Sequence, residues 1–224
     1  MKRMVLIPAY NEEATIPLVI RDIREHCQDI VVVDDGSTDF TGAVARDEGA
    51  MVIPHGQNKG YAEALRTGYR YALEQNYDGI VQIDADGQHD PGHIPELFRR
   101  GQSWDVVIGS RFLGRQKYES PLSKAVGVRI FRHIIQRETG LNITDPTSGY
   151  RYMYSRAIRF CSRLRCNYPD ANLIIMMHRA GMTITESPVK MQPNAEGKSM
   201  HKGKTIKYIR EVFASITMEM KCRI

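Results

Sequence analysis

Short runs of Val and Ile alternate with amphipathic stretches along the first half of the chain. The apolar runs lie at residues 4–9, 29–35, 50–55, 79–84 and 105–110. Brief, nearly continuous runs that end in turn-forming residues are typical of strands covered on both faces. Helical patterns separate them at residues 12–27, 38–48, 60–75 and 91–101. Strands that alternate with helices predict an α/β fold with a mostly parallel sheet.

The pattern changes after residue 111. A basic helical stretch at 121–139 precedes "NITDPTSGYRYMYS", a further predicted helix and a predicted strand, "ITESPVKM". The chain closes with "NAEGKSMHKGK" and a last helical pattern. Neither an internal repeat nor a low-complexity linker separates the two parts. We therefore expect the later elements to pack on the same sheet, within a single domain.

Polar clusters follow the predicted strands at the point where each strand ends. They read "PAYNEE", "DDGSTD", "HGQNKG", "DADGQH" and "GSRF". Ligands of open α/β sheets bind at the carboxyl ends of the strands. Five loops that converge on one edge predict a ligand site there, and this coincidence is more specific than any single cluster.

The cluster "DADGQH" has the chemistry of a cation site. Asp84, Asp86 and Gln88 alternate along an extended segment, so their side chains can point the same way. Hard oxygen ligands in this number suit Mg²⁺ or Mn²⁺, which also bridge to substrate phosphates. A cation would offset the repulsion between the carboxylates. The alternative is an Asp-rich turn without a metal.

The remaining candidates are weaker when each is taken alone. His89 and His93 are four residues apart and could bind zinc, although loop and capping roles are favoured. Asp34 or Asp35 could accept hydrogen bonds from a nucleobase or a ribose, or could serve turn and helix-cap chemistry. Lys59 and Gly60 stand at a helix start and could approach a phosphate, without the spacing of a Walker A loop.

Composition narrows the class of protein. The chain has 224 residues, a net charge of +5 and plentiful acidic residues, which argues against a general nucleic-acid binder. Its four cysteines form no C-x-x-C pair and, with no secretory leader visible, are expected to be reduced thiols of a cytoplasmic protein. No run approaches the roughly 18 apolar residues of a spanning helix, so we expect no membrane crossing.

Six motifs in order resemble the family 2 glycosyltransferases, in particular the dolichol-phosphate mannosyltransferase-like or polyprenyl-phosphate glycosyltransferase group. They are "IPAYNEE", "VVVDDGSTD", "NKGYAEALRTG", "DADGQHDP", "GSRF" and "DPTSGYR", within residues 3–203. The resemblance implies a GT-A fold, a Rossmann-like mixed sheet flanked by helices over residues 1–203. Residues 1–111 would form the nucleotide-sugar half and 112–203 the acceptor half. It also implies inverting, metal-dependent sugar transfer from a UDP- or GDP-linked donor.

The resemblance also assigns roles residue by residue. For the nucleotide sugar it implies Pro8, Tyr10, Glu12, Asp34 or Asp35, Lys59, Gly60, Asp84, Arg111, Lys198 and Ser199. For the metal it implies Asp86 and Gln88, with Asp84 in the same motif. Asp145 matches the proposed catalytic carboxylate, with an Asp-Pro turn as the alternative, and Arg151 falls in the acceptor region. The acceptor is either a polyprenyl phosphate or a growing surface glycan.

Three departures from the family pattern leave other functions open. Asn194 stands where relatives usually carry an Arg, so Lys198, His201 or Lys202 would have to replace that cation. Asp170 is alone in a usually acidic stretch, and we expect no C-terminal spanning helix. A non-catalytic subunit that binds sugar nucleotide is therefore the main alternative. A sugar nucleotidyltransferase is disfavoured, because "PAYNEE" is not its Gly-rich loop.

The last predicted element, residues 204–224, is an amphipathic helix. Within residues 202–221, one face carries Ile206, Ile209, Val212, Phe213, Ile216 and Met220, and the first half carries Lys202, Lys204, Lys207 and Arg210. Such a helix can lie in a membrane interface and attract anionic lipid. We predict peripheral binding to the inner face of the plasma membrane, with a small integral membrane protein as a further partner. The alternative is a terminal helix docked on the core.

Overall fold

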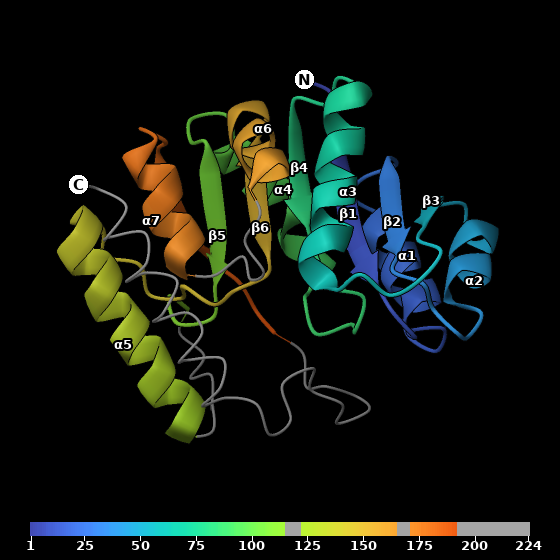
Figure 1. Ribbon diagram of the computed structural model, residues 1–224, viewed down its shortest axis with the longest axis horizontal. Coiled ribbons are helices and arrows are strands. Elements are labelled where there is room, and N and C mark those ends of the chain that lie inside the picture. The colour runs from blue at the N-terminus through green and yellow to red at the C-terminus, as the bar shows by residue number, and fades with distance from the viewer. Residues whose placement is uncertain (115–121, 165–170, 192–224) are drawn as a thin grey trace.

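The computed structural model describes residues 1–114, 122–164 and 171–191. Its strands are β1 (Arg3–Ala9), β2 (Ile30–Asp34), β3 (Met51–Pro54), β4 (Gly79–Gln82), β5 (Val106–Ser110), β6 (Arg151–Tyr154) and β7 (Ile184–Pro188). Its helices are α1 (Ile16–Arg24), α2 (Thr41–Asp47), α3 (Tyr61–Glu74), the 3-10 turn η1 (Pro91–His93), α4 (Ile94–Arg100), α5 (Leu122–Thr139), α6 (Ser155–Arg163) and α7 (Ala171–Arg179). Helices lie on both faces of one sheet (Figure 1).

The strands of this sheet follow the order β3-β2-β1-β4-β6-β5-β7. All neighbours are parallel except β6, which runs antiparallel to both β4 and β5. The five strands of the first half and the strand in "ITESPVKM" confirm their predictions, and so does the mostly parallel mixed sheet. The strand β6 was not predicted. It has four residues, begins with a charged side chain and leads directly into α6 without a turn residue, so its sequence carries little strand signal.

Both faces of the sheet are buried, which explains the continuous apolar runs. Along β1, Met4 and Leu6 face one core cluster, and Val5 and Ile7 face the other. Side chains of α3, α5, α6 and α7 complete the first cluster, and those of α1, α2 and α4 complete the second.

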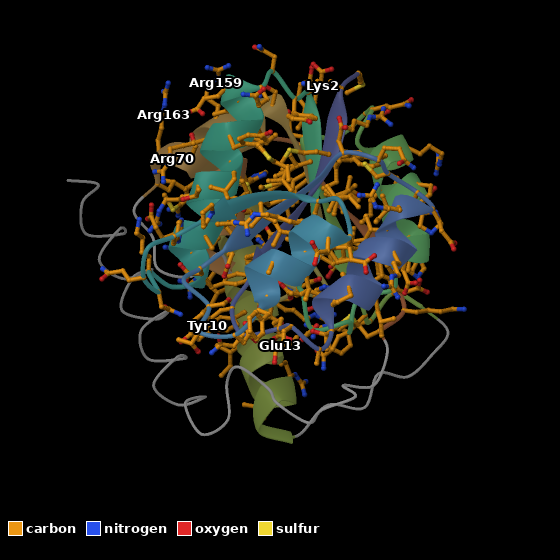
Figure 2. All side chains as sticks on the ribbon, turned by 90° about the vertical axis from the view of Figure 1, so that its right-hand side faces the viewer. Lys2, Tyr10, Glu13, Arg70, Arg159 and Arg163 are labelled. Atoms are coloured by element: carbon orange, nitrogen blue, oxygen red, sulfur yellow. The ribbon has the colours of Figure 1, made fainter. Side chains whose placement is uncertain are left out.

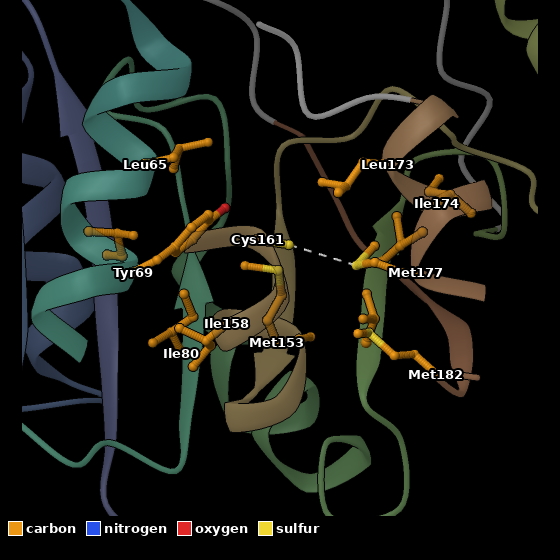
Figure 3. Close-up of a cluster of buried hydrophobic side chains, with 14 of the residues drawn as sticks. Leu65, Tyr69, Ile80, Met153, Ile158, Cys161, Leu173, Ile174, Met177 and Met182 are labelled. Atoms are coloured by element: carbon orange, nitrogen blue, oxygen red, sulfur yellow. Dashed lines mark hydrogen bonds between the residues drawn. The ribbon is translucent and has the colours of Figure 1, made fainter. Parts of the chain in front are cut away.

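The first cluster joins the two halves of the sequence (Figure 3). Tyr69 of α3 packs in it with Ile80 of β4, and the sulfur of Cys161 in α6 lies 4.0 Å from that of Met177 in α7. Cys161 is buried and Cys27 is half-buried, and both are free thiols. The remaining two cysteines lie outside the described residues. This shared core agrees with a single domain.

The predicted halves, residues 1–111 and 112–203, are interleaved within the sheet. The strand β6, from the second half, pairs with β4 and β5 of the first half. The two halves therefore share a sheet, and the boundary between them stays a prediction. The predicted helix at 204–224 lies outside the described residues. Among the helices that the structure describes, none has the length and apolar character needed to span a bilayer.

Three predicted helices differ in extent from the observed ones, and the one predicted at 38–48 is α2, Thr41–Asp47. The helix predicted at 12–27 is α1, Ile16–Arg24, because the residues before it form a loop in which Thr15 N donates to Glu12 O. The helix predicted at 91–101 is divided into η1 and α4. Asp90 caps η1 by accepting from Gly92 N at 2.9 Å. The later start of α1 and the division into η1 and α4 place polar residues in loops at the candidate site.

Candidate active site

The loops that follow β1, β2, β4 and β5 emerge at one edge of the sheet, the lower edge in Figure 1. Tyr10 and Glu13 lie toward this edge, whereas Lys2, Arg70 and Arg159 lie toward the opposite one (Figure 2). The strand β1 pairs with β2 on one side and β4 on the other, so the order of strands reverses there. Ligands of open α/β sheets bind at such a switch point. The expected convergence of the polar loops is confirmed.

The first two loops are tied together by hydrogen bonds. Asn11, with a φ of 56°, accepts from Thr38 N at 2.8 Å and donates its own N–H to Ser37 Oγ at 3.0 Å. Glu12 N donates to Thr41 Oγ1 at 2.7 Å. Sequence analysis did not single out Asn11, although Asn is among the few residue types that tolerate this backbone region. These bonds make the two loops one wall of the site.

The predicted contacts of the first loop differ in accessibility. Pro8 is buried within β1, where it pairs with Val33. Tyr10 is 44% exposed, so its ring is available to a ligand. Glu12 is half-buried, and its carboxylate accepts from Thr15 Oγ1 at 2.8 Å. Of the three, Tyr10 is the side chain most accessible for a nucleotide to contact.

Asp34 and Asp35 have different roles in the structure. Asp35 is 3% exposed, and its carboxylate accepts from His55 Nδ1 at 2.6 Å, Lys59 N at 3.0 Å and Gly60 N at 2.8 Å. It therefore holds the loop before α3. Asp34 is half-buried and accepts from Ser37 N at 3.0 Å through one oxygen. Asp34 is thus the better placed of the two for a ligand.

The glycine of "DDGSTD" is required by close packing. Gly36 has a φ of +72°, and a Cβ added there would lie 2.4 Å from the backbone carbon of Gln57. Any side chain at this position would push the second loop away from the residues that lead into α3. The same leading segment presents the exposed side chain of Lys59.

The cation motif has fixed carboxylates. Asp84 Oδ1 accepts from Tyr61 Oη at 2.8 Å, and Asp86 Oδ1 accepts from Gln88 N at 3.0 Å. Burial, and next the negative charge of Asp84, raise the pKa of Asp86 above its ordinary value. A cation between such carboxylates would reverse that effect. The donor set therefore fits Mg²⁺ or Mn²⁺.

The two histidines of this segment have loop roles. His89 Nδ1 accepts from Asp84 N at 3.1 Å, and His93 Nε2 accepts from Lys190 N at 2.9 Å. Burial lowers the pKa of both rings, which favours the neutral form that can accept. The loop roles favoured from sequence are confirmed. Within the described ranges no three His, Cys, Asp or Glu side chains form a metal-binding group.

Arg111 and Asp145 form a buried ion pair at the end of β5. Asp145 has no exposed surface, and Arg111 is nearly as buried. Arg111 Nε lies 2.6 Å from Oδ2 of the carboxylate, and Nη2 lies 2.7 Å from Oδ1. Arg111 N also donates to Oδ2 at 3.1 Å. Such a two-point pair is geometrically specific.

A match to a family model and several relatives identify the chain. Residues 4–160 match the model described as glycosyl transferase family 2. The chain belongs to this family. An undecaprenyl-phosphate mannosyltransferase from Micrococcus luteus is 32% identical over 218 residues, covering 91% of this chain and 88% of the relative. A UDP-N-acetylglucosamine–dolichyl-phosphate N-acetylglucosaminyltransferase from Methanococcus voltae is 31% identical, covering 83% and 84%.

Solved structures agree with the GT-A fold of this family 2 glycosyltransferase. Glucosyl-3-phosphoglycerate synthase from Mycobacterium tuberculosis, with phosphoglyceric acid, is 25% identical with a TM-score of 0.72, covering 95% of this chain and 78% of that one. Mannosyl-3-phosphoglycerate synthase from Rubrobacter xylanophilus has a TM-score of 0.74 at 16% identity, covering 100% and 76%. The second likeness concerns the fold alone.

Glu186 of the glycosyltransferase was not identified from sequence. Its carboxylate accepts from Thr144 N at 2.7 Å and from Asp145 N at 2.8 Å, so it fixes the backbone that carries Asp145. Burial raises the pKa of Glu186. The sequence feature that could have identified Glu186 is its position as a charged residue within a predicted strand. Thr144 Oγ1 also lies 2.6 Å from Ser110 Oγ, which ties the same turn to β5.

Arg151 closes this turn from the other side. It is buried at 2% exposure, and it donates to Ser148 O at 2.7 Å and to Pro146 O at 3.0 Å. These bonds hold the Arg151 side chain inside its own loop. Its predicted role in the acceptor region stays a prediction. Several predicted residues lie outside the described part of the chain, namely Asp170, Asn194, Lys198, Ser199, His201 and Lys202.

Proposed function

We propose that this glycosyltransferase moves a sugar from a UDP- or GDP-linked donor to a polyprenyl phosphate, with inversion and with Mg²⁺ or Mn²⁺. The observation that carries the proposal is the pair Asp84 and Asp86, both fixed by hydrogen bonds, at the switch point of the sheet. The names of the two relatives support a polyprenyl-type phosphate acceptor, and one of them supports a UDP donor.

On the donor side, different residues would bind different parts of the nucleotide sugar. Asp34 would accept hydrogen bonds from the nucleoside, and its backbone pairs with Ala9, which precedes the exposed Tyr10. Asp84, Asp86 and Gln88 would hold the cation, and Lys59 would approach a phosphate. When bound, the cation stabilises the charge that develops on the departing nucleoside diphosphate.

Asp145 would act with Arg111 on the acceptor side. A polyprenyl phosphate is already an anion and needs no base, whereas a glycan hydroxyl must lose a proton. Both Asp145 oxygens are engaged by Arg111 and shielded from solvent. The role that fits this arrangement is orientation of the guanidinium, not acceptance of a proton. The arrangement therefore favours a polyprenyl phosphate acceptor over a glycan acceptor.

A transfer assay tests the proposal. We expect UDP- or GDP-sugar, polyprenyl phosphate and Mn²⁺ to give lipid-linked sugar, and EDTA to abolish it. Transfer to a glycan alone would replace the proposed acceptor. Donor binding with neither transfer nor hydrolysis would favour the non-catalytic subunit. Peripheral membrane binding and a membrane partner remain predictions that depend on residues 202–221, outside the described residues.

A further inference from the structure

A hydrogen-bond network built around the buried Gln82 reaches one carboxylate oxygen of Asp84. The Tyr61 hydroxyl, at the start of α3, donates to Asp84 Oδ1 at 2.8 Å and accepts from Gln82 Nε2 at 3.0 Å. Gln82 Nε2 also donates to Gly149 O at 2.9 Å, and Gln82 Oε1 accepts from Tyr69 Oη at 2.8 Å. Gln82 is 1% exposed, so these partners replace water.

Chemistry fixes the direction of every bond in this network. The carbonyl of Gly149 can only accept, so the side of the Gln82 amide that faces it must be the NH₂ group. The same NH₂ donates to the Tyr61 oxygen, and the hydroxyl has a single proton. That proton must therefore go to Asp84. The carboxylate has a dedicated donor whose orientation is set from two other elements of the fold.

We propose that Tyr61 is a positioning residue for the cation site, because it fixes the carboxylate of Asp84. The inference rests on the proposed function, since it assumes that Asp84 and Asp86 bind a divalent cation. A tyrosine hydroxyl, with an ordinary pKa of about 10, keeps its proton at neutral pH and can donate it to the carboxylate. Loss of a partner that orients a metal ligand typically lowers metal affinity or activity by about 10- to 100-fold.

The same residue links the donor and acceptor sides. Asp35 holds the N–H groups of Lys59 and Gly60, directly before Tyr61. A Cβ added at Gly149 would lie 3.0 Å from Asp84 Oδ2 and 3.2 Å from the Tyr61 oxygen. The loop before β6 thus packs against Asp84 and Tyr61. Tyr61 therefore couples the position of the Asp84 carboxylate to that of the loop before α3 and the loop before β6.

The test compares Tyr61→Phe with Tyr69→Phe in the full chain. Each removes one buried hydroxyl from the same network, but only the first removes the donor to Asp84. Melting temperature is followed while Mn²⁺ is titrated at fixed UDP, and at fixed GDP in a parallel series, because a ligand of the native state raises it by mass action. We expect Tyr61→Phe to need about 10-fold more Mn²⁺ for the half-maximal rise. The Mn²⁺ concentration for the half-maximal rise should be close to the wild-type value in Tyr69→Phe.

Each outcome decides between the two proposals. If wild type shows no Mn²⁺-dependent response to either nucleotide, the proposed function fails, and the inference fails with it. If wild type responds and Tyr61→Phe matches it, the function stands and the positioning role is wrong. A lower melting temperature without metal, together with an unchanged Mn²⁺ midpoint, would make the hydroxyl merely structural. Should Tyr61→Phe not fold, Gln82→Met removes the group that orients the hydroxyl, and its Mn²⁺ midpoint should rise or the inference is overturned.

Discussion

The guanidinium of Arg111 and the carboxylate of Asp145 face each other at two points in a site closed to solvent. Removing one partner of a buried pair leaves the other charge uncompensated, at a cost of about 3 kcal/mol. We therefore expect Asp145→Asn to lower the free energy of unfolding by about that amount. Its turnover should fall by about 10², because the guanidinium of Arg111 loses its fixed orientation, and donor affinity should change by only a few-fold. Urea unfolding, donor binding and the transfer assay measure the three quantities.

A double variant separates stability from catalysis in this pair. Apolar replacement of a whole buried pair is often neutral or stabilising, so Arg111→Met with Asp145→Leu should recover much of the lost stability. Turnover should remain low if the pair acts on the acceptor. Recovery of turnover along with stability would show that Arg111 and Asp145 serve the fold alone.

The second prediction concerns the cation. Asp86→Ala should abolish the Mn²⁺-dependent rise in melting temperature with UDP or GDP and leave the metal-free protein about as stable as wild type. Burial and the charge of Asp84 already disfavour the ionised Asp86 when no cation is bound, as its raised pKa indicates.

Asp90→Ala is the matched control for this experiment. Asp90 belongs to the same motif but caps η1 through Gly92 N. Its loss should cost about 1 kcal/mol of stability, as for a helix cap, without changing the Mn²⁺ response. Equal Mn²⁺ responses of Asp86→Ala and wild type would exclude Asp86 as a ligand.

Sequence patterns predicted the sheet well because burial on both faces leaves a strong apolar signal. They also predicted the site edge, since the polar clusters stand where parallel strands end. The single missed strand, β6, is short and begins with Arg151, whose burial depends on carbonyls of its own loop. Hydrophobic periodicity does not predict a strand that begins with a buried charge.

Hydrogen-bond partners were harder to predict than the edge itself. Asp34 and Asp35 are adjacent, yet only Asp35 faces inward, because it accepts hydrogen bonds from His55 and from the residues that precede α3. Tyr61 and Glu186 reach their carboxylate and backbone partners across separations of 23 and 41 residues. These pairings follow from the packing of distant elements, which residue spacing does not encode.

The third prediction distinguishes the neighbouring aspartates. Asp35→Asn replaces one of the two acceptor oxygens by an NH₂ group that must face at least one of the three donors, so we expect a loss of about 1–3 kcal/mol in unfolding free energy. Asp34→Asn keeps an oxygen for Ser37 N and should be nearly as stable as wild type, yet bind UDP and GDP more weakly. Urea unfolding and nucleotide titration on both variants measure this. Normal nucleotide binding by Asp34→Asn would remove Asp34 from the donor site.

The last prediction concerns the dependence of stability on pH. Burial raises the pKa of Glu186 above its ordinary value of 4.5, so the folded state takes up a proton more readily than the unfolded state does. Stability must then fall as pH rises from about 4.5 through the raised pKa, because the unfolded state binds fewer protons in that window. Glu186→Gln has no group to ionise, so its stability should lack this component. Urea unfolding of both proteins from about pH 4 to pH 7 tests the difference. Parallel curves for wild type and Glu186→Gln would mean that the three hydrogen bonds from Thr144 and Asp145 fully offset the burial of the charge.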